Sequence, residues 1–238
     1  MPATAVPLDR RHRRRLETIE EVLDHAVEIM AEEGVAGLSL GEIARRMGIR
    51  PPSLYVYFPS KNALYDALFE RGWRLVLDDT TSYDEAHPAV EDDLAEILLR
   101  SANHFVRWSI ENFAYAQLLI WRPVPGFRPS DSAYVPATEL YQHTLTRVTH
   151  LQQRGLIRGD ADTEAVLRDW TVLISGVISQ QLSNAPDEAF EKGRFTAALP
   201  GLADMFAAHY AAPTPVPARK PTASARRETA RRGNASKR

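Results

Sequence analysis

The 238-residue chain contains no cysteine, which excludes disulfides, zinc fingers, iron–sulfur clusters and thiol catalysis. It also lacks an apolar run of the roughly 18 residues that a membrane-spanning helix needs. Residues 1–15 show no apolar core followed by a small-residue cleavage site, so we expect no signal peptide and a cytoplasmic protein. Hydrophobic residues at 44% and charged residues at 25% are typical of a soluble globular chain.

Patterns that usually carry catalysis are missing as well. None of the seven histidines forms a His-x-x-x-His pair, and there is neither a nucleophile elbow nor a glycine-rich phosphate loop. The paired acids Asp78–Asp79 and Asp92–Asp93 are interpreted as surface groups near helix ends. We therefore expect a protein that is not an enzyme, with no catalytic residue, no metal site and no cofactor.

The net charge of −2 conceals an uneven distribution. Residues 1–15 carry +4 and residues 211–238 carry +7, whereas residues 16–62 carry −4 and residues 63–210 carry −9. The tail, 211–238, is too poor in large apolar residues to offset the entropy of ordering, so we expect it to be disordered. Two interpretations stay open for it: a solubilising end, or a segment attracted to a polyanion.

Between the two basic ends the apolar residues recur at helical spacing, and no segment alternates as a strand does. The fold class predicted is therefore all-α. Nine helices are expected, over residues 16–33, 39–47, 51–57, 60–81, 89–112, 114–121, 132–154, 162–184 and 187–210. Gly34 should end the first helix, Ser39 and Glu42 have the spacing of a capping box, and Ser60 and Asp162 should cap later helices.

Residues 38–58, LSLGEIARRMGIRPPSLYVYF, have the layout of a helix-turn-helix. Two short helices flank a turn at Gly48, and Ala44 is small where the helices must approach. Apolar residues stand at positions that would pack the pair on the first helix; they are Ile43, Met47, Ile49 and Leu54. In such a motif the second helix enters the DNA major groove. The alternative is an ordinary helical hairpin.

The stretch GLSLGEIARRMGIRPPSLYVYFPSKNAL closely resembles the DNA-binding segment of the tetracycline-repressor (TetR) family of bacterial regulators. The resemblance extends from Ile19 to Leu68, and beyond it only the number, length and order of helices match. It implies a dimer with an N-terminal helix-turn-helix unit, 16–62, and a helical ligand-binding and dimerisation unit, 63–210. Residues 1–15 would then be a disordered basic arm, either reaching the DNA backbone or an adjacent minor groove, or merely solvated.

The resemblance also implies which residues touch DNA. Carried over by position, these are Ser39, Pro51, Pro52, Ser53, Tyr55, Tyr57 and Lys61. Gly41 stands where some family members place a base-reading arginine; Arg45, Arg46 and Arg50 are candidates for that role, and we favour Arg50 because it adjoins the recognition helix. Tyr57 could instead pack in the core, and Lys61 could be a solvated residue of the cap region.

A ligand pocket is expected where aromatic residues are concentrated, since residues 104–141 hold eight of the twenty in the chain. The candidates are His104, Phe105, Trp108, Trp121, Tyr134 and Tyr141. The dimer interface is expected on the last two helices, with Val166, Trp170, Leu173, Val177, Gln181, Leu202 and Phe206. Both sets could equally bury against their own subunit.

Together these features predict a sequence-specific DNA-binding transcription regulator. We expect a homodimeric repressor that binds a pseudo-palindromic double-stranded operator and is released by a small apolar effector, without a membrane partner. The alternative is an accessory or architectural helix-turn-helix protein that has no ligand. An enclosed pocket between the fourth and eighth helices would favour the first interpretation, and a solid core there would favour the second.

Overall fold

The structure is a computed structural model, and it describes residues 10–90 and 93–213. Throughout these two ranges the secondary structure is helical, with no strand, which confirms the all-α prediction. The elements are α1 (Arg10–Glu33), η1 (Val35–Gly37), α2 (Leu40–Arg46), α3 (Pro51–Leu54), α4 (Lys61–Ala86), α5 (Leu94–Glu111), α6 (Phe113–Ala116), η2 (Gln117–Trp121), α7 (Val135–Gln153), α8 (Thr163–Asn184), η3 (Phe190–Lys192), η4 (Thr196–Ala198) and α9 (Leu199–Tyr210). None of the described helices is long and apolar enough to cross a membrane.

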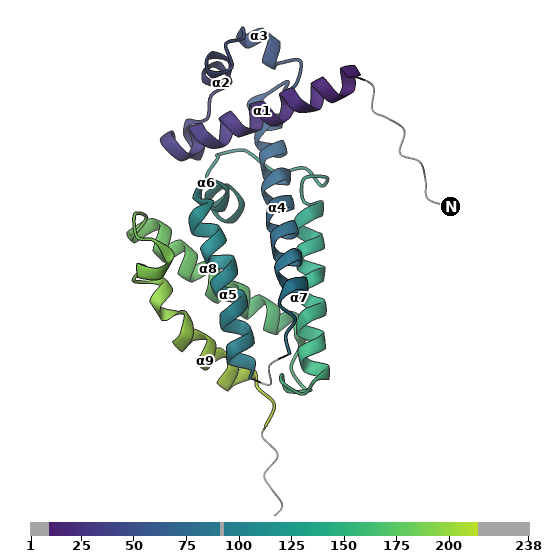
Figure 1. Cartoon of the computed structure of the whole chain (residues 1–238), viewed down its shortest axis with the longest axis vertical. Coiled ribbons are helices and arrows are strands. Elements are labelled where there is room, and N and C mark those ends of the chain that lie inside the picture. The colour runs from purple at the N-terminus through teal and green to yellow at the C-terminus, as the bar shows by residue number, and fades with distance from the viewer. Residues whose placement is uncertain (1–9, 91–92, 214–238) are drawn as a thin grey trace, which may run out of the picture.

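Helices α1, α2 and α3 form a head at one end of the molecule (Figure 1). Helix α4 begins at the head, beneath α1, and runs along the body beside α7. Helices α5, α8 and α9 make up the other side of the body, and α9 packs against α5. The long helix α4 therefore belongs to both the head and the body.

Several helix boundaries follow the local signals. The Ser60 hydroxyl accepts a hydrogen bond from the Ala63 amide at 3.1 Å, and the Asp162 carboxylate accepts one from the Glu164 amide at 3.2 Å. Gly34 ends α1 with φ +76°, a backbone conformation that side chains disfavour. Asp93, expected to be a surface group, caps α5 by accepting bonds from the next amides.

Other boundaries differ from the expectation. Helix α1 begins at Arg10 rather than at residue 16, so the basic run 10–15 is helical and is not a disordered arm. Residues 187–210 do not form one helix, because Gly193 and Pro200 interrupt it and α9 begins only at Leu199. The tail 211–238 was expected to be disordered, but the Ala211 and Ala212 amides donate to the Ala207 and Leu156 carbonyls. The rest of that prediction, 214–238, lies outside the described residues.

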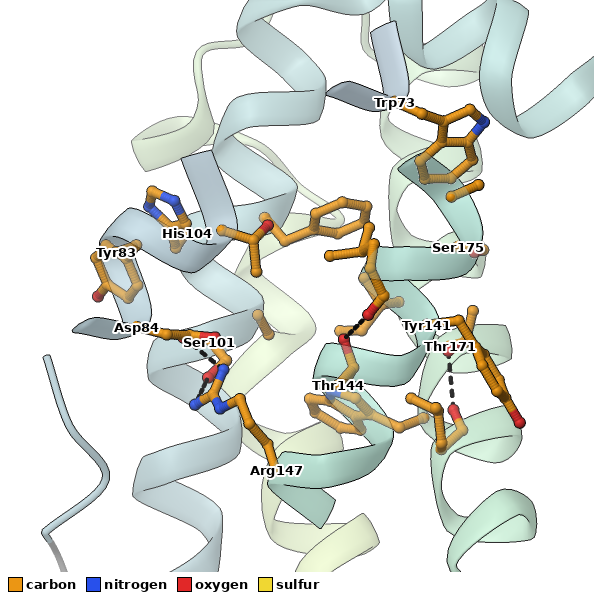
Figure 2. Close-up of a pocket in the computed structure, with 18 of the residues that line it drawn as sticks. Trp73, Tyr83, Asp84, Ser101, His104, Tyr141, Thr144, Arg147, Thr171 and Ser175 are labelled. Carbon is orange, nitrogen blue, oxygen red and sulfur yellow. Dashed lines mark hydrogen bonds and ion pairs between the residues drawn. The ribbon is translucent and has the colours of Figure 1, made fainter. Parts of the chain in front are cut away.

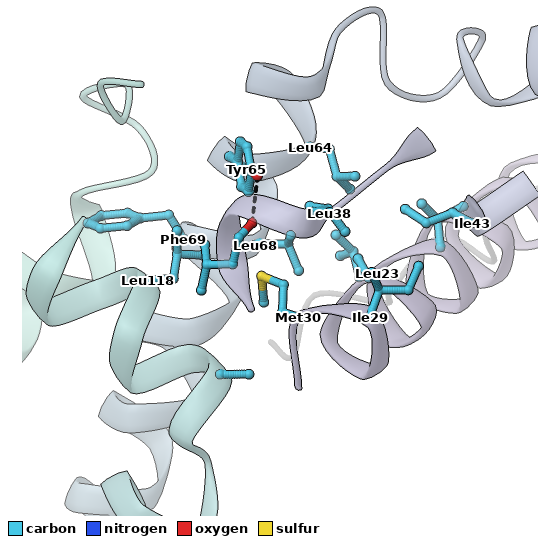
Figure 3. Close-up of a cluster of buried hydrophobic side chains, with 14 of the residues drawn as sticks. Leu23, Ile29, Met30, Leu38, Ile43, Leu64, Tyr65, Leu68, Phe69 and Leu118 are labelled. Atoms are coloured by element: carbon cyan, nitrogen blue, oxygen red, sulfur yellow. Dashed lines mark hydrogen bonds between the residues drawn. The ribbon is translucent and has the colours of Figure 1, made fainter. Parts of the chain in front are cut away.

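The head is held by a cluster of buried side chains in which Ile29, Met30, Ile43 and Leu64 are fully buried (Figure 3). This cluster continues along α4 and onto α6, η2 and the loop before α7, where it takes in Leu118, Phe127 and Ala133. The domain boundary predicted at residue 62 falls inside α4, so apolar packing is continuous between head and body.

Candidate nucleic-acid interface and ligand cavity

The helix-turn-helix is built as its local sequence indicates. Gly48 adopts φ +66° in the turn between α2 and α3, where a Cβ would be strained. Arg50 is extended, and the following Pro51 and Pro52 occupy the first turn of α3, where proline removes no helical hydrogen bond. Ile43, Ala44 and Leu54 are fully buried, so α2 and α3 are fixed against α1.

The residues predicted to touch DNA are gathered on this motif. Seven are exposed, and they are Ser39, Arg50, Pro51, Pro52, Ser53, Tyr55 and Lys61. Tyr57 is half-buried and packs on the core of the head, as the alternative interpretation for that residue has it. Although α3 ends at Leu54, the turn that follows it keeps Tyr55 open to solvent, with 53% of its surface exposed.

Two of the three arginine candidates are held by carboxylates. Arg45 donates to Glu42 at 2.7 Å, and Arg46 bonds both Glu42 and Glu32. Hydrogen bonds from Arg45 and Arg46 lower the pKa of Glu42 to about 2. The expected capping box is absent, because Glu42 pairs with these arginines and the Ser39 side chain accepts no capping bond. Arg50 has no ion pair among the described residues, so it is the arginine that is open to a ligand.

Lys61 is exposed, and its side chain contacts two groups of the head. Its ammonium donates to the Ala36 carbonyl at 3.2 Å and lies 5.5 Å from the centre of the Tyr65 ring. Tyr65 in turn donates its hydroxyl to the Val35 carbonyl at 2.7 Å, and burial raises its pKa to about 12. These contacts join the start of α4 to the short turn η1, and they leave donors of Lys61 for a further partner.

The acidic residues of α1 form ion pairs in two directions: Glu32 bonds Arg46 of α2, and others face α4. Arg71 of α4 bonds Asp24 and lies 3.4 Å from Glu20. Beside it, burial raises the pKa of Tyr115 to about 12. Carboxylates that seem unsuited to a DNA-binding head therefore join α1 to α4 as well as to α2.

A cavity of about 320 Å³ lies within the body, between α4, α5, α7 and α8 (Figure 2). Apolar side chains make up most of its wall, including Trp73, Phe105, Leu140 and Trp170. Polar side chains also line the cavity, but they contribute little of its surface, as is usual in small-molecule sites. Tyr141, with 41% of its surface exposed, also lines the cavity, so the cavity reaches solvent at α7.

Three of the six predicted pocket residues line this cavity: His104, Phe105 and Tyr141. Trp108, Trp121 and Tyr134 do not line it, because they pack in the apolar clusters. The ring of Tyr134, for example, lies 5.0 Å from that of Phe69 on the body of α4. Aromatic density in the sequence thus identified the region, but not which rings face the cavity.

Other lining residues were missed by the sequence reasoning. Trp73, Thr80 and Asp84 recur along one face of α4, and Arg147 extends from α7. Their helical spacing was available as a signal, but an inward-facing row is equally typical of a solid core. Trp170, predicted for the dimer interface, lines the cavity instead.

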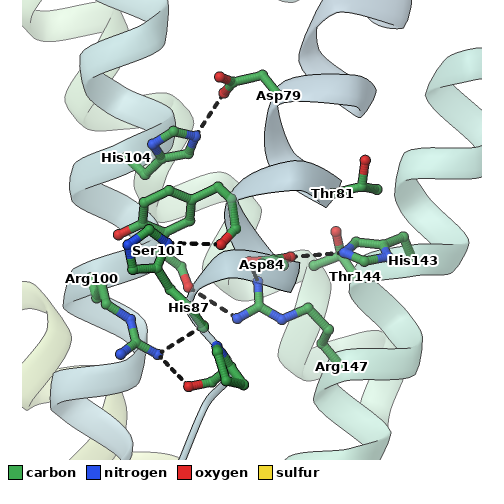
Figure 4. A network of polar contacts seen from close by, with 12 residues as sticks. Asp79, Thr81, Asp84, His87, Arg100, Ser101, His104, His143, Thr144 and Arg147 are labelled. Carbon is green, nitrogen blue, oxygen red and sulfur yellow. Dashed lines mark hydrogen bonds and ion pairs between the residues drawn. The ribbon is translucent and has the colours of Figure 1, made fainter.

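One end of the cavity is a polar network that connects three helices (Figure 4). Asp84 of α4 accepts a hydrogen bond from Arg147 and lies 2.8 Å from His143, both on α7. Arg147 also donates to the Ser101 hydroxyl of α5 at 3.3 Å. Only 10% of the Asp84 side chain is exposed, so this carboxylate lies at the centre of the network.

A second pair on the same side involves His104 of α5. Its Nε2 lies 2.7 Å from Asp79 of α4, and its ring stacks on Tyr83 with centres 3.8 Å apart. The described residues include no group of three or more histidines and carboxylates that could hold a metal ion. The chemistry available to the cavity is therefore apolar contact with hydrogen bonding at one end.

The predicted dimer residues are mostly internal. Val166, Val177, Gln181 and Phe206 are buried within the single chain, which excludes them from a surface that could meet a partner. Gln181 donates to the Ala185 carbonyl at 2.7 Å and accepts from the Phe195 amide, so it holds the loop after α8. Leu173 and Leu202 are half-buried against the same clusters.

The exposed face of α8 and α9 carries other residues. Val172 and Met205 expose 68% and 61% of their surfaces, which is unusual for large apolar side chains. Gly176 and Gly201 are exposed on the same two helices, and a Cβ added at either would meet no atom within 4 Å. These four residues are here called the α8–α9 face.

Comparison with known proteins places this architecture in a family. The family described as "Bacterial regulatory proteins, tetR family" matches residues 22–68, which contain the helix-turn-helix. The class C tetracycline repressor protein of Escherichia coli is 28% identical over 174 residues, covering 73% of this chain and 70% of that protein. The uncharacterized HTH-type transcriptional regulator YobS of Bacillus subtilis (strain 168) is 32% identical over 161 residues, covering 66% of this chain and 79% of YobS.

Solved structures share the fold over most of the chain. A protein of unknown function from Rhodococcus sp. RHA1 superposes with a TM-score of 0.67 at 21% identity, covering 81% of this chain and 95% of that one. At this identity the likeness shows the fold alone, and the relationship rests on the sequence matches. The chain belongs to the TetR family of bacterial transcriptional regulators, and its head is the DNA-binding helix-turn-helix of that family.

Proposed function

We propose that this regulator is a homodimeric repressor that leaves a pseudo-palindromic operator when a small, mostly apolar molecule binds. The observation that carries the proposal is the cavity of about 320 Å³ bordered by α4, the helix that also begins in the DNA-binding head. A solid core at this place would have favoured an accessory DNA-binding protein without a ligand. The related class C protein is a tetracycline repressor, which supports repression and not activation by this chain.

The DNA contacts proposed for the head divide into two kinds. Arg50 would read a base edge, since it adjoins α3 and no carboxylate of the described residues neutralises it. Ser53 in α3 and Tyr55 directly after it would contact base edges and the backbone, and the two prolines would contact thymine methyls or sugars. Ser39 and Lys61 would hold phosphates at the starts of α2 and α4.

The dimer would form through the α8–α9 face. In a two-fold interface the same patch meets itself, and two exposed apolar side chains beside two glycines allow close helix approach. The partner would cover Val172 and Met205 and remove their apolar surface from water. The two heads would then be held at a fixed separation, which a pseudo-palindromic operator requires.

Regulation would act through α4. The effector would occupy the apolar cavity and meet the polar network at Asp84 and Arg147. Since Asp84 lies near one end of α4 and Ser60 caps the other end at the head, a shift of this helix changes the spacing of the two reading heads. Such coupling needs an effector that binds the DNA-free state more tightly, typically by 5- to 150-fold.

The first test concerns the head. The full chain would select its operator from random duplex DNA, and the affinities of Arg50→Ala and Arg128→Ala for that duplex would then be measured. Arg128 is an exposed arginine of the body, so it matches the charge change. We expect the affinity for the selected duplex to fall about 10- to 100-fold in Arg50→Ala and less than twofold in Arg128→Ala. Equal losses would contradict the assignment of Arg50.

The second test concerns the cavity and uses the neutral apolar fluorophore 1-aminoanthracene. We expect the wild-type chain to bind it with increased fluorescence, and Ala137→Phe, which fills part of the cavity, to lose that binding. The matched control Ala86→Phe changes an exposed alanine at the end of α4 that does not line the cavity. If no ligand-like probe enters the cavity in wild type, the accessory interpretation is supported instead.

A further inference from the structure

The first turns of α1 carry basic residues on the same side of the helix that, farther along, packs against the core of the head. Farther along α1, Val22 and Ala26 are fully buried against the head. The same stripe, at spacings of three and four residues, continues backwards through Thr18, Arg15 and Arg11. The inward side of α1 therefore changes from apolar to basic where the helix passes the edge of the core (Figure 1).

A groove of about 840 Å³ lies between these basic turns and the segment that follows α3. It is lined by Arg10, Arg11, His12, Arg14, Arg15, Thr18, Val56 and Tyr57. Among the residues that the structure describes, no acidic side chain lines it, and the first turn of α1 from Arg10 contains none. The groove is thus a concentrated positive site in a protein whose overall charge is −2.

Its arginines are differently placed. Arg15 is held in position, since its guanidinium lies 5.2 Å from the centre of the Tyr57 ring and 3.5 Å from the Val56 carbonyl oxygen. Within the described ranges, the side chains of Arg11 and Arg14 form no ion pair and no hydrogen bond. By contrast, Arg46 of α2 and Arg71 of α4 are paired with carboxylates. The groove leaves several guanidinium groups available to an anion from outside.

We infer that this groove binds the phosphate backbone of DNA beside the half-site that α3 reads. Val56 and Tyr57, which form its other wall, come directly after Tyr55, so the groove is continuous with the recognition segment. Guanidinium groups suit phosphate oxygens in both charge and geometry. The inference rests on the proposed DNA-binding role of the head and adds a second contact to it.

The helical form of residues 10–15 decides what the contact can be. An α-helix with its side chains is about 10–12 Å wide, whereas the minor groove of B-DNA is only about 6 Å wide. A helix therefore lies along the backbone and does not enter the minor groove. The contact contributes affinity that depends on salt and is the same for all sequences.

The test compares Arg11→Gln with Arg13→Gln in the full-length chain. Both variants remove one charge from the same helical turn, but Arg13 does not line the groove. The probe is a 30-base-pair duplex of random sequence, with binding measured over a range of salt concentrations. For each head that is bound, we expect Arg11→Gln to lower the log–log salt slope by about 0.9 and to weaken binding about eightfold at 0.1 M salt. Arg13→Gln should change the affinity less than twofold.

Two further measurements keep the inference distinct from the proposed function. Arg11→Lys keeps the charge and should keep the salt slope. Arg11→Gln should lower the affinity for a duplex selected by the wild-type chain and the affinity for a random duplex by the same factor. Equal losses for Arg11→Gln and Arg13→Gln, or a change of sequence preference alone, would overturn the groove assignment. If wild type selects no sequence while Arg11→Gln still weakens random-duplex binding, the operator proposal fails and the groove stands.

Discussion

Removal of the Tyr65 hydroxyl measures how firmly α4 is joined to the head. In Tyr65→Phe the ring keeps its packing, with the Phe127 ring 5.5 Å away, and only the 2.7 Å bond to the Val35 carbonyl is lost. Tyr65 is fully buried, so the carbonyl is left without this donor. Such a loss lowers the free energy of unfolding by about 2 kcal/mol, within a usual range of about 1–3 kcal/mol. For a chain of this size the melting temperature falls by about 4–8 °C.

The chain offers a matched control in Tyr115→Phe. Tyr115 is also buried, but its hydroxyl has no hydrogen-bond partner among the described residues. The same atom is removed from a similar environment, and no hydrogen bond is lost. Thermal unfolding followed by circular dichroism should therefore show no loss of stability for this variant. Equal destabilisation by the two variants, or none from Tyr65→Phe, would refute the reasoning.

The raised pKa of Tyr65 also predicts how the stability of the chain depends on pH. The pKa of Tyr65 is about 12 in the folded chain, against an ordinary value of 10. Between these values the unfolded chain holds fewer protons, so the stability supplied by this group is complete below pH 10 and decreases towards pH 12. The difference between wild type and Tyr65→Phe should shrink by up to about 1.4 kcal/mol for each pH unit above 10. A difference that stays constant to pH 12 would contradict this.

Two further changes test the turn between α2 and α3 and the polar network around Asp84. Gly48→Ala should lower the free energy of unfolding by about 1–2 kcal/mol, because the turn requires φ +66° at this residue. Thermal unfolding measures this loss, and an unchanged melting temperature would contradict it. Asp84→Asn should cost about 2 kcal/mol in urea unfolding, because only 10% of the Asp84 side chain is exposed and its arginine partner loses its counter-charge. The control Asp160→Asn, whose side chain is 83% exposed, should cost less than about 0.5 kcal/mol.

The helix-turn-helix was predictable because its signals are local. A turn glycine and two prolines at a helix start each act on residues within about four positions. Their spacing therefore identifies the motif before any tertiary contact is known. The capping box at Ser39 and Glu42 failed because Glu42 bonds Arg45 and Arg46, three and four residues ahead on the same helix, and the sequence alone did not show which of these local contacts Glu42 makes.

The cavity was predictable only as a region. Its polar end joins Asp84, Ser101 and Arg147 from three helices, and its wall needs Trp170 from a fourth. Helical periodicity shows which side of a helix is apolar, but it does not show whether that side meets a neighbour or a space. For the same reason it could not separate the buried Val177 from the exposed Val172 on α8.

The sequence alone determined the helical class, the DNA-binding motif and the separation of charge into basic ends and an acidic body, since these depend on composition and short-range spacing. Only the tertiary structure decided what the charges do. It pairs the carboxylates of α1 with Arg46 and Arg71, and it carries α1 beyond the core, so that Arg11 and Arg15 border an unfilled groove. Where a helix ends relative to its core depends on residues far apart in the chain, and no local pattern records it.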